Sequence, residues 1–298
     1  MNQTRDYDFC ASHDFYGHTA CPGCGEKILL RHILNSLGSQ TVIVVPAGCA
    51  AVTDGVFPHS LSPVPLLHVA FGATASAAAG VRAGLDMSGK TDVTVLAWAG
   101  DGATFDIGMG ALSAIAERNE NIIYVCYDNE AYMNTGVQRS SATPSATWTT
   151  TTPKGYLKTE PKKDIDAIMA SHHIPYIATA SPAYIDDLKM KTNRAKSIHG
   201  FRFLHLFSPC PPGWKSDPKD SITIAKLAVE SNIFPLYEIY DGARYVLNHH
   251  SQNVPVNEYL ELQGRFKYMK ANERDAFQAN VNKFYHFLEN QNDIIQQS

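Results

Sequence analysis

The sequence lacks the features that mark nucleic-acid-binding, secreted and membrane-spanning proteins. Its 298 residues hold 25 Lys and Arg against 29 Asp and Glu, so no excess of positive charge is present to bind nucleic acid or an anionic membrane surface. The charged residues 1–8 are not followed by an apolar segment, and no later apolar run is as long as a membrane span. We expect a cytoplasmic protein with no nucleic-acid or membrane partner, and we find no internal repeat.

Cysteine is scarce, and the histidines show no spacing that suggests a site. Six cysteines are too few and too unevenly placed for a disulfide scaffold in a chain of this size. In a cytoplasmic protein, clustered cysteines more often bind metal or carry out redox chemistry. None of the twelve histidines stands at a metal-ligand spacing from another, so we assign them no role.

Hydrophobic residues make up 44% of the chain, which is enough for a substantial core. Short apolar runs alternate with segments of helical period. This order predicts an α/β protein with a doubly wound, mostly parallel sheet and helices on both faces. The expected strands are 41–45, 92–99, 121–127, 176–180 and 201–207, and the expected helices are 27–37, 72–85, 106–117, 164–171 and 182–197.

The pattern changes after residue 215. A helix at 221–230, a strand pair at 237–245 and a polar helix at 273–290 are expected there. We predict one domain over 1–215 and a C-terminal extension over 216–298 that packs on a partner, with a simple solvated extension as the alternative. Within the first domain, the segment between 129 and 160 is rich in Thr, Ser, Pro and Gly and has no regular period. Long loops of this kind are often functional.

The triplet Gly100-Asp101-Gly102 directly follows an expected strand and precedes an expected helix. It therefore lies at the carboxyl end of a parallel strand, where doubly wound sheets bind ligands and a helix amino terminus favours phosphate. The glycines allow close approach of a ligand, and the Asp101 carboxylate is suited to a divalent cation. The alternative is a tight turn in which Asp101 caps the helix.

The next strand along the chain ends just before Asn129. One strand-helix-strand unit brings the ends of both strands to the same edge of the sheet, so the amide oxygen of Asn129 is expected beside Asp101. The backbone carbonyl of Ala131 offers a third oxygen as the chain turns into the loop. Magnesium prefers a few protein oxygens completed by phosphate and water, so this edge is a candidate magnesium site.

Four cysteines fall where the predicted fold can bring them together. Cys21 and Cys24 share one tight turn, Cys49 follows the first strand, and Cys210 follows the strand at 201–207. Four thiols at one rim of the sheet suit either a tetrahedral zinc or a cubane iron-sulfur cluster, and the spacing does not decide between them. Cys126 lies in an apolar strand and is expected in the core, and Cys10 lies in a polar leader without a role in ligation.

These motifs resemble one known family. The stretch 100–129 resembles the thiamine-diphosphate motif, and Tyr132-Met133-Asn134-Thr135-Gly136-Val137-Gln138 resembles a loop of pyruvate:ferredoxin oxidoreductases and related 2-oxoacid oxidoreductases. The four cysteines, with Cys210 inside Ser208-Pro209-Cys210-Pro211-Pro212-Gly213-Trp214, are similar to the same family's cluster-binding pattern. The resemblance runs from Gly17 through Glu261-Leu262-Gln263-Gly264-Arg265-Phe266 and is closest to the thiamine-binding beta subunit.

The resemblance implies three cofactors and their residues. Magnesium would be held by Asp101, Asn129 and Ala131, although the family often has Thr in place of Asn129. A [4Fe-4S] cluster would be held by Cys21, Cys24, Cys49 and Cys210. Asn134 would orient the substrate, and Glu26 would contact thiamine diphosphate, unless it is only an acidic residue in the first turn of its helix. The cofactor contacts implied in this way are Glu26, Gly48, Cys49, Gly100, Asp101, Gly102, Ala103, Asn129, Ala131, Tyr132 and Asn134.

The resemblance also implies a reaction and partners. The complex would decarboxylate a 2-oxoacid, with pyruvate favoured, and form acyl-CoA and CO2 with coenzyme A while electrons pass through the cluster to ferredoxin. The partner subunits would be a pyrimidine-binding alpha, a gamma and a ferredoxin-like delta subunit. No residue here can be assigned as the glutamate that activates the thiamine, so the chain alone would be inactive. Alternatives are a branched-chain, aryl or oxalate substrate, a non-redox thiamine decarboxylase or synthase subunit, and a zinc-bearing structural subunit.

Overall fold

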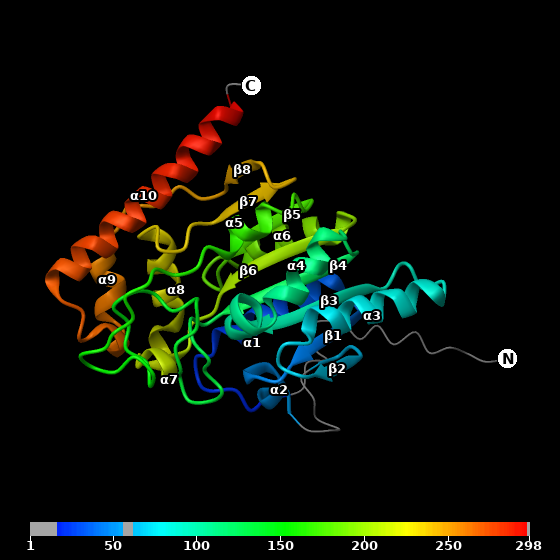
Figure 1. Cartoon of the computed structure of the whole chain (residues 1–298), viewed down its shortest axis with the longest axis horizontal. Helices are drawn as coiled ribbons and strands as arrows, with labels where there is room; N and C mark the ends of the chain where they lie inside the picture. Colours follow the sequence, from blue (N-terminus) through cyan, green and yellow to red (C-terminus); the bar gives the residue numbers. More distant parts are fainter. Residues whose placement is uncertain (1–16, 56–61, 297–298) are drawn as a thin grey trace.

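The computed structural model describes residues 17–55 and 62–296, and their side chains as far as residue 291. Cys10 lies outside the described residues. The centre of the described chain is one eight-stranded sheet in the order β2-β1-β3-β4-β6-β5-β7-β8 (Figure 1). The strands are β1 (Thr41–Pro46), β2 (Leu66–Val69), β3 (Thr94–Gly100), β4 (Ile122–Asp128), β5 (Tyr176–Ala180), β6 (Phe201–Phe207), β7 (Tyr237–Tyr240) and β8 (Arg244–Leu247).

The first six strands pair in parallel, and β7 and β8 are added antiparallel at one edge. All seven residues of β4 and of β6 are buried, as expected for central strands that are covered on both faces. Their sequences accordingly read as nearly continuous apolar runs. The structure confirms the predicted doubly wound, mostly parallel α/β fold.

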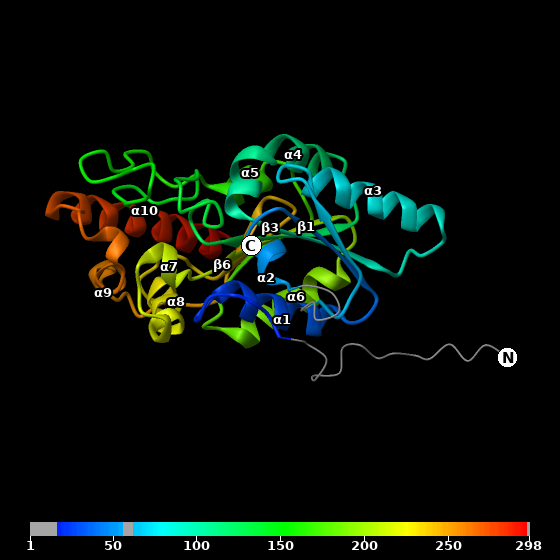
Figure 2. The same ribbon diagram turned by 90° about the horizontal axis from the view of Figure 1, so that it is seen from below.

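Helices cover both faces of the sheet. Figure 2 shows α3, α4 and α5 on one side and α1 and α6 on the other. The helices that pack on the sheet are α1 (Gly25–Leu37), α2 (Cys49–Thr53), α3 (Thr74–Met87), η1 (Gly102–Ile107), α4 (Met109–Glu117), α5 (Ile165–Ala170) and α6 (Ile185–Ser197). Those that follow β6 are α7 (Pro211–Trp214), η2 (Pro218–Asp220), α8 (Ser221–Glu230), α9 (Val256–Glu261), η3 (Gly264–Phe266) and α10 (Ala271–Gln296).

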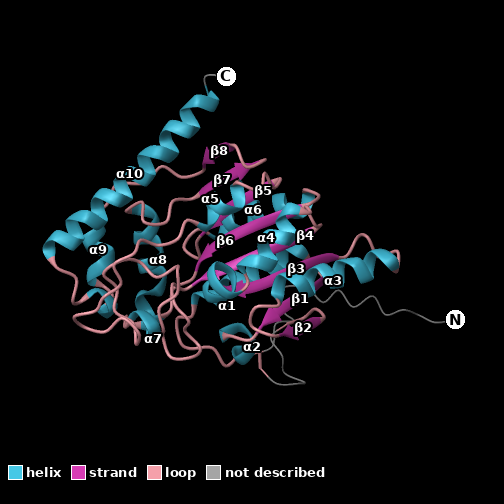
Figure 3. Ribbon diagram, viewed as in Figure 1, coloured by secondary structure: helices cyan, strands magenta, loops and turns pink. Residues whose placement is uncertain are grey.

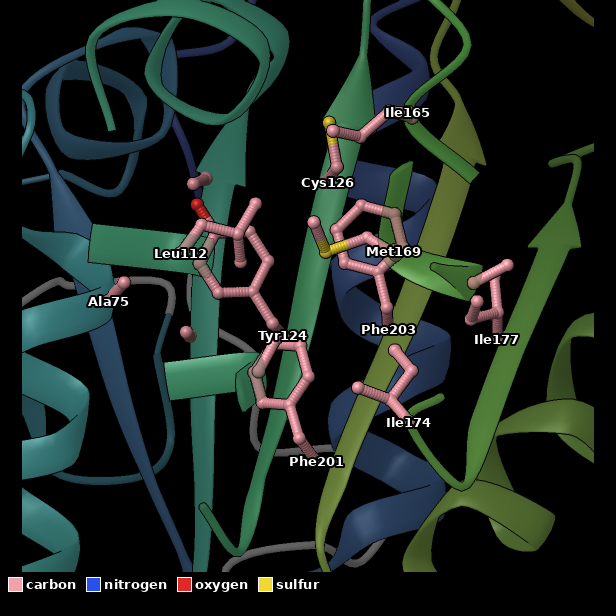
Figure 4. Close-up of a cluster of buried hydrophobic side chains, with 14 of the residues drawn as sticks. Ala75, Leu112, Tyr124, Cys126, Ile165, Met169, Ile174, Ile177, Phe201 and Phe203 are labelled. Atoms are coloured by element: carbon pink, nitrogen blue, oxygen red, sulfur yellow. The ribbon is translucent and has the colours of Figure 1, made fainter. Parts of the chain in front are cut away.

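The alternation of side chains along each strand divides the core into two layers. On β3, Val95 and Ala97 belong to the layer under α3, α4 and α5, whereas Leu96 and Trp98 belong to the layer under α1 and α6. Figure 4 shows the first layer, where Tyr124 of β4 lies near Leu112, Phe201 and Phe203. Cys126 is fully buried in this layer, which confirms its predicted place in the core.

A third apolar cluster joins α7, α8, α9 and η3 to the end of β6. Phe207, the last residue of β6, packs in it with Trp214, Tyr259 and Phe266. In Figure 3 the loops gather beside these short helices, at the carboxyl ends of the central strands. This cluster therefore supports the edge of the sheet where the sequence places the site.

The segment after residue 215 contributes to the same sheet through β7 and β8. The helix α10 lies along β8, and its residues Tyr285 and Leu288 belong to the first core layer. The division at residue 215 and the packing of 216–298 on a partner remain predictions. Among the helices of the described chain, none has the length and apolar character needed to cross a membrane.

Buried charges connect the central strands to α5. On β6, His205 Nε2 lies 2.9 Å from Asp128 Oδ2, and His205 Nδ1 lies 2.9 Å from Asp166 Oδ2. The Tyr237 hydroxyl donates to the same Asp166 oxygen at 2.9 Å. Burial opposes a charge on His205, but Asp166 and Asp128 outweigh it and raise the histidine pKa to about 9.

This pKa predicts how stability depends on pH. Because the folded-state pKa of His205 exceeds the value of about 6.5 expected for an unfolded chain, the stabilisation is complete below pH 6.5 and is lost as pH rises through about 9. We expect the unfolding midpoint of His205→Gln to fall less between these pH values than that of the wild type, as measured by thermal melts. The exposed His286→Gln is the control and should keep the wild-type pH dependence. If the unfolding midpoint fell equally with pH in all three proteins, His205 would not be the group responsible.

Candidate cofactor and metal site

A cavity of about 260 Å³ opens at the carboxyl ends of β1, β3 and β4. These three strands are neighbours in the sheet, so their ends meet where doubly wound folds bind ligands. Every cofactor contact expected from the sequence lines this cavity, except Glu26. The lining residues are Ala47, Gly48, Cys49, Phe71, Gly100, Asp101, Gly102, Ala103, Tyr127, Asn129, Ala131, Tyr132, Met133, Asn134 and Thr135.

Three oxygen atoms converge at one point of the cavity wall. The side-chain oxygen of Asn129 lies 2.9 Å from the carbonyl oxygen of Ala131 and 3.0 Å from Oδ1 of Asp101. An octahedral magnesium ion with bonds of about 2.1 Å separates neighbouring ligand oxygens by about 3.0 Å. Without a cation, the amide would be turned so that its NH2 group donates to both oxygens. The donor set and its spacing therefore fit a magnesium ion.

The Asp101 carboxylate is buried beside a second carboxylate. Only 1% of Asp101 is exposed, and burial together with the charge of Asp128 raises its pKa well above the usual range. The Ser140 hydroxyl donates to Asp101 Oδ2 at 2.5 Å, which leaves Oδ1 facing Asn129. The carboxylate makes no capping hydrogen bond to η1, the helix that follows it. Asp101 thus stands at the N-cap position without capping the helix through its side chain, and a divalent cation would compensate its buried charge.

A tyrosine and a glycine shape the next part of the wall. The Tyr132 hydroxyl donates to Asp106 Oδ2 at 2.8 Å, and this bond holds the ring against Gly102. A Cβ atom at Gly102 would lie 2.3 Å from Tyr132 Cε1, so only glycine fits there. Tyr132 also bridges to Gln138, which closes the loop that carries the exposed Asn134 along the cavity.

Glu26 lies one layer behind the cavity. It is 2% exposed, in the first turn of α1, and its Oε1 accepts a hydrogen bond from Trp98 Nε1 at 2.8 Å. Trp98 in turn stacks on the cavity residue Tyr127 with ring centroids 5.6 Å apart. Glu26 Oε2 lies 3.2 Å from the Lys27 ammonium but accepts no hydrogen bond. Glu26 thus accepts a buried hydrogen bond from Trp98 and does not line the cavity.

The four candidate ligand cysteines lie close enough to influence one another. Burial and the thiols of Cys210 and Cys24 raise the pKa of Cys49 to about 12, with Cys21 adding to the effect. Burial raises the pKa of Cys24 to about 12 and that of Cys210 to about 11. The backbone N–H of Gly25 donates to the Pro209 carbonyl at 3.0 Å and links the two cysteine-bearing segments. A bound metal would be needed to hold these thiols as thiolates.

Among the described residues, no three His, Cys, Asp or Glu side chains surround a single ion position. The four cysteines are all described, so they are gathered at one edge without surrounding a single ion position. Their arrangement does not decide between a zinc ion and an iron-sulfur cluster.

Comparisons with known proteins show the family of the chain. Residues 47–206 match the thiamine pyrophosphate enzyme family in its C-terminal TPP binding domain. The ketoisovalerate oxidoreductase subunit VorB of Pyrococcus horikoshii is 45% identical over 275 residues, which cover 89% of this chain and 88% of that protein. The pyruvate synthase subunit PorB of Methanothermobacter thermautotrophicus is 44% identical over 268 residues, covering 89% and 93%.

The chain belongs to the 2-oxoacid:ferredoxin oxidoreductase family as a thiamine-diphosphate-binding beta subunit. A solved 2-oxoglutarate:ferredoxin oxidoreductase from Magnetococcus marinus superposes on it with a TM-score of 0.57 over 72% of this chain and 80% of that one. At 23% identity, this likeness supports the fold of the beta subunit.

The structure adds residues to the beta-subunit site that the sequence did not single out. Ser140 orients Asp101, Asp106 anchors Tyr132, and Tyr127 separates the cavity from Glu26. Ser140 lies in the segment 129–160, which its composition marked as functional. Its partner Asp101 is 39 positions away, and no local period connects the two.

The close contact between Gly102 and Tyr132 gives a test of the beta-subunit cavity. We expect Gly102→Ala to push the tyrosine ring into the cavity and to weaken thiamine diphosphate binding by about 10-fold or more, because overpacking typically costs about 1–3 kcal/mol. Calorimetric titration of the purified complex measures this affinity. Gly110→Ala in α4 is the control, because a Cβ there meets nothing within 4 Å. If both variants bind the cofactor equally well, the cavity does not hold it.

Proposed function

We propose that this beta subunit carries the thiamine diphosphate, magnesium and [4Fe-4S] site of an enzyme that oxidises a 2-oxoacid with coenzyme A to acyl-CoA and CO2. The observation that carries the proposal is the position of Cys49. This candidate cluster ligand lines the same cavity as the three converging oxygens, so cluster and thiamine would be adjacent. A non-redox decarboxylase or synthase would have no use for four cysteines gathered there.

Each part of the cavity would have its own task. Asp101, Asn129 and the Ala131 carbonyl would hold magnesium, and the backbone at Gly102 and Ala103 would approach the diphosphate. Asn134, exposed on the loop along the cavity, would orient the 2-oxoacid. Thiamine diphosphate, when bound, supplies the carbanion chemistry of decarboxylation, and a cluster on Cys21, Cys24, Cys49 and Cys210 supplies one-electron transfer toward ferredoxin.

The reaction would require the other subunits of the complex. In the described part of the chain, no glutamate is among the residues that line the cavity, so the group that activates the thiamine would come from a pyrimidine-binding alpha subunit. Gamma and ferredoxin-like delta subunits are the further partners that we propose, in the cytoplasm. The isolated chain would then bind thiamine diphosphate weakly and turn over nothing.

Pyruvate is the substrate that we propose. A branched-chain 2-oxoacid is the second candidate, because the relatives named for ketoisovalerate and for pyruvate are 45% and 44% identical to this chain and do not separate the two.

Anaerobic purification of the complex tests the proposal. We expect iron, acid-labile sulfide and thiamine in the wild type, and ferredoxin reduction that depends on coenzyme A and is faster with pyruvate than with ketoisovalerate. Cys49→Ser should lose iron and sulfide, whereas Cys126→Ala, which changes a core thiol, should retain them. Zinc without labile sulfide would overturn the cluster assignment, and faster turnover of ketoisovalerate would overturn the choice of substrate.

A further inference from the structure

The two proposed magnesium ligands Asn129 and Ala131 are separated by a residue in an unusual backbone conformation. Glu130 has φ of +68°, in the left-handed region that residues other than glycine rarely adopt. This turn brings the side chain of Asn129 and the carbonyl of Ala131 to the same point. Because the conformation is unfavourable by itself, surrounding contacts must hold it.

The Glu130 side chain is anchored by two cationic groups, the partly exposed Lys162 and the buried Arg265. It is 2% exposed, and its Oε1 accepts a hydrogen bond from Lys162 Nζ at 2.8 Å. Its Oε2 lies 2.7 Å from Arg265 Nη2, as an ion contact outside hydrogen-bond geometry. Its backbone carbonyl accepts a hydrogen bond from Thr143 Oγ1 at 2.6 Å. The turn is therefore fixed from the side that faces away from the cavity.

Arg265 is itself held rigidly. It is 2% exposed, and its guanidinium carbon lies 3.9 Å from the centre of the Trp214 ring. Its Nε donates to Gln263 Oε1, and its Nη2 donates to the Tyr259 hydroxyl, each at 2.9 Å. Because the planar guanidinium stacks on a ring and donates hydrogen bonds from two nitrogens, a lysine ammonium in its place would lose these contacts.

Trp214 contacts the same turn at Asn129. Its indole N–H donates to the backbone carbonyl of Asn129 at 2.8 Å. Arg265 thus contacts the carboxylate of Glu130 directly and the peptide of Asn129 through the tryptophan on which it stacks. Arg265, from the segment 261–266, and Trp214, from the segment 208–214, therefore both contact the turn at residues 129–131.

We propose that Arg265 and Trp214 are positioning residues for magnesium in this subunit: Arg265 holds Glu130 in its left-handed conformation, and Trp214 holds the peptide of Asn129. The proposal rests on the magnesium site proposed above. It gives a role to Arg265, which contacts neither the cavity nor the converging oxygens.

Manganese binding tests the proposal without relying on turnover. The free Mn²⁺ signal in electron paramagnetic resonance gives the affinity of the purified complex in the presence of thiamine diphosphate. We expect Arg265→Met to bind Mn²⁺ about 10- to 100-fold more weakly than the wild type, as for other residues that orient metal ligands. Arg265→Lys should lie between the two, because it keeps the charge and loses the stacked fork.

A control separates positioning from general loss of stability. Arg82 is also 2% exposed and donates to the carbonyls of Val93 and Lys90, at the opposite end of β3 from the site. Arg82→Met should lower the unfolding midpoint and leave the Mn²⁺ affinity unchanged. If the Arg265→Met complex does not assemble, Trp214→Phe tests the proposal instead. This variant keeps an aromatic ring and loses the hydrogen bond to Asn129, so we expect Mn²⁺ to bind about 10-fold more weakly.

The outcomes distinguish this proposal from the proposed magnesium site on which it rests. Wild-type affinity in Arg265→Met, or in Trp214→Phe where that variant decides, would overturn the positioning role and leave the magnesium site intact. A wild-type complex that binds thiamine diphosphate without Mn²⁺ would overturn both.

Discussion

The arrangement of the site depends on two buried carboxylates at the ends of neighbouring parallel strands. Asp101 follows β3 and Asp128 ends β4, and each is at most 1% exposed. Burial opposes ionisation of Asp128, but Lys162 and His205 outweigh it and hold its pKa at about 2. The pKa of Asp101 is instead raised by burial and by Asp128. The fold therefore neutralises one carboxylate with its own side chains and leaves the other suited to a metal ion.

The C-terminal part of the chain serves the same edge of the sheet. The third apolar cluster packs Trp214 and Phe266 against the end of β6, so Trp214 can reach Asn129 and Arg265 can reach Glu130. Cys210 is the residue before α7, the short helix that contains Trp214. The segment that offers a proposed cluster ligand thus also supports the turn at residues 129–131, where we propose magnesium binding, so the two proposed cofactor sites share one structural unit.

Sequence patterns predicted the parts of this arrangement that depend on local period and chain direction. The ends of β3 and β4 could be placed because their apolar runs are long and parallel strands end at a common edge, and this placement brought Asp101 and Asn129 together. The four-residue strand β2 and the five-residue helix α2 were missed because they are too short for a period to show. The helix expected to start at Asp106 begins earlier, as the π-helix η1.

Contacts between residues distant in sequence were beyond prediction for a different reason. Ser140 with Asp101, Arg265 with Glu130 and Trp98 with Glu26 meet only in the folded chain. No spacing signals any of them. Glu26 illustrates this, because the family resemblance implied a contact with thiamine diphosphate but gave no sign that the side chain lies behind Trp98 and Tyr127.

We propose that the oxygens of Asp101, Asn129 and Ala131 lie close together because they surround a cation. The most direct measurement is anomalous scattering from crystals of the complex grown with thiamine diphosphate and Mn²⁺. We expect one manganese peak bonded to the Asp101 carboxylate, the Asn129 side-chain oxygen and the Ala131 carbonyl. An Asn129 amide turned so that its NH2 group donates to Asp101 and Ala131, with manganese bound elsewhere or not at all, would contradict it.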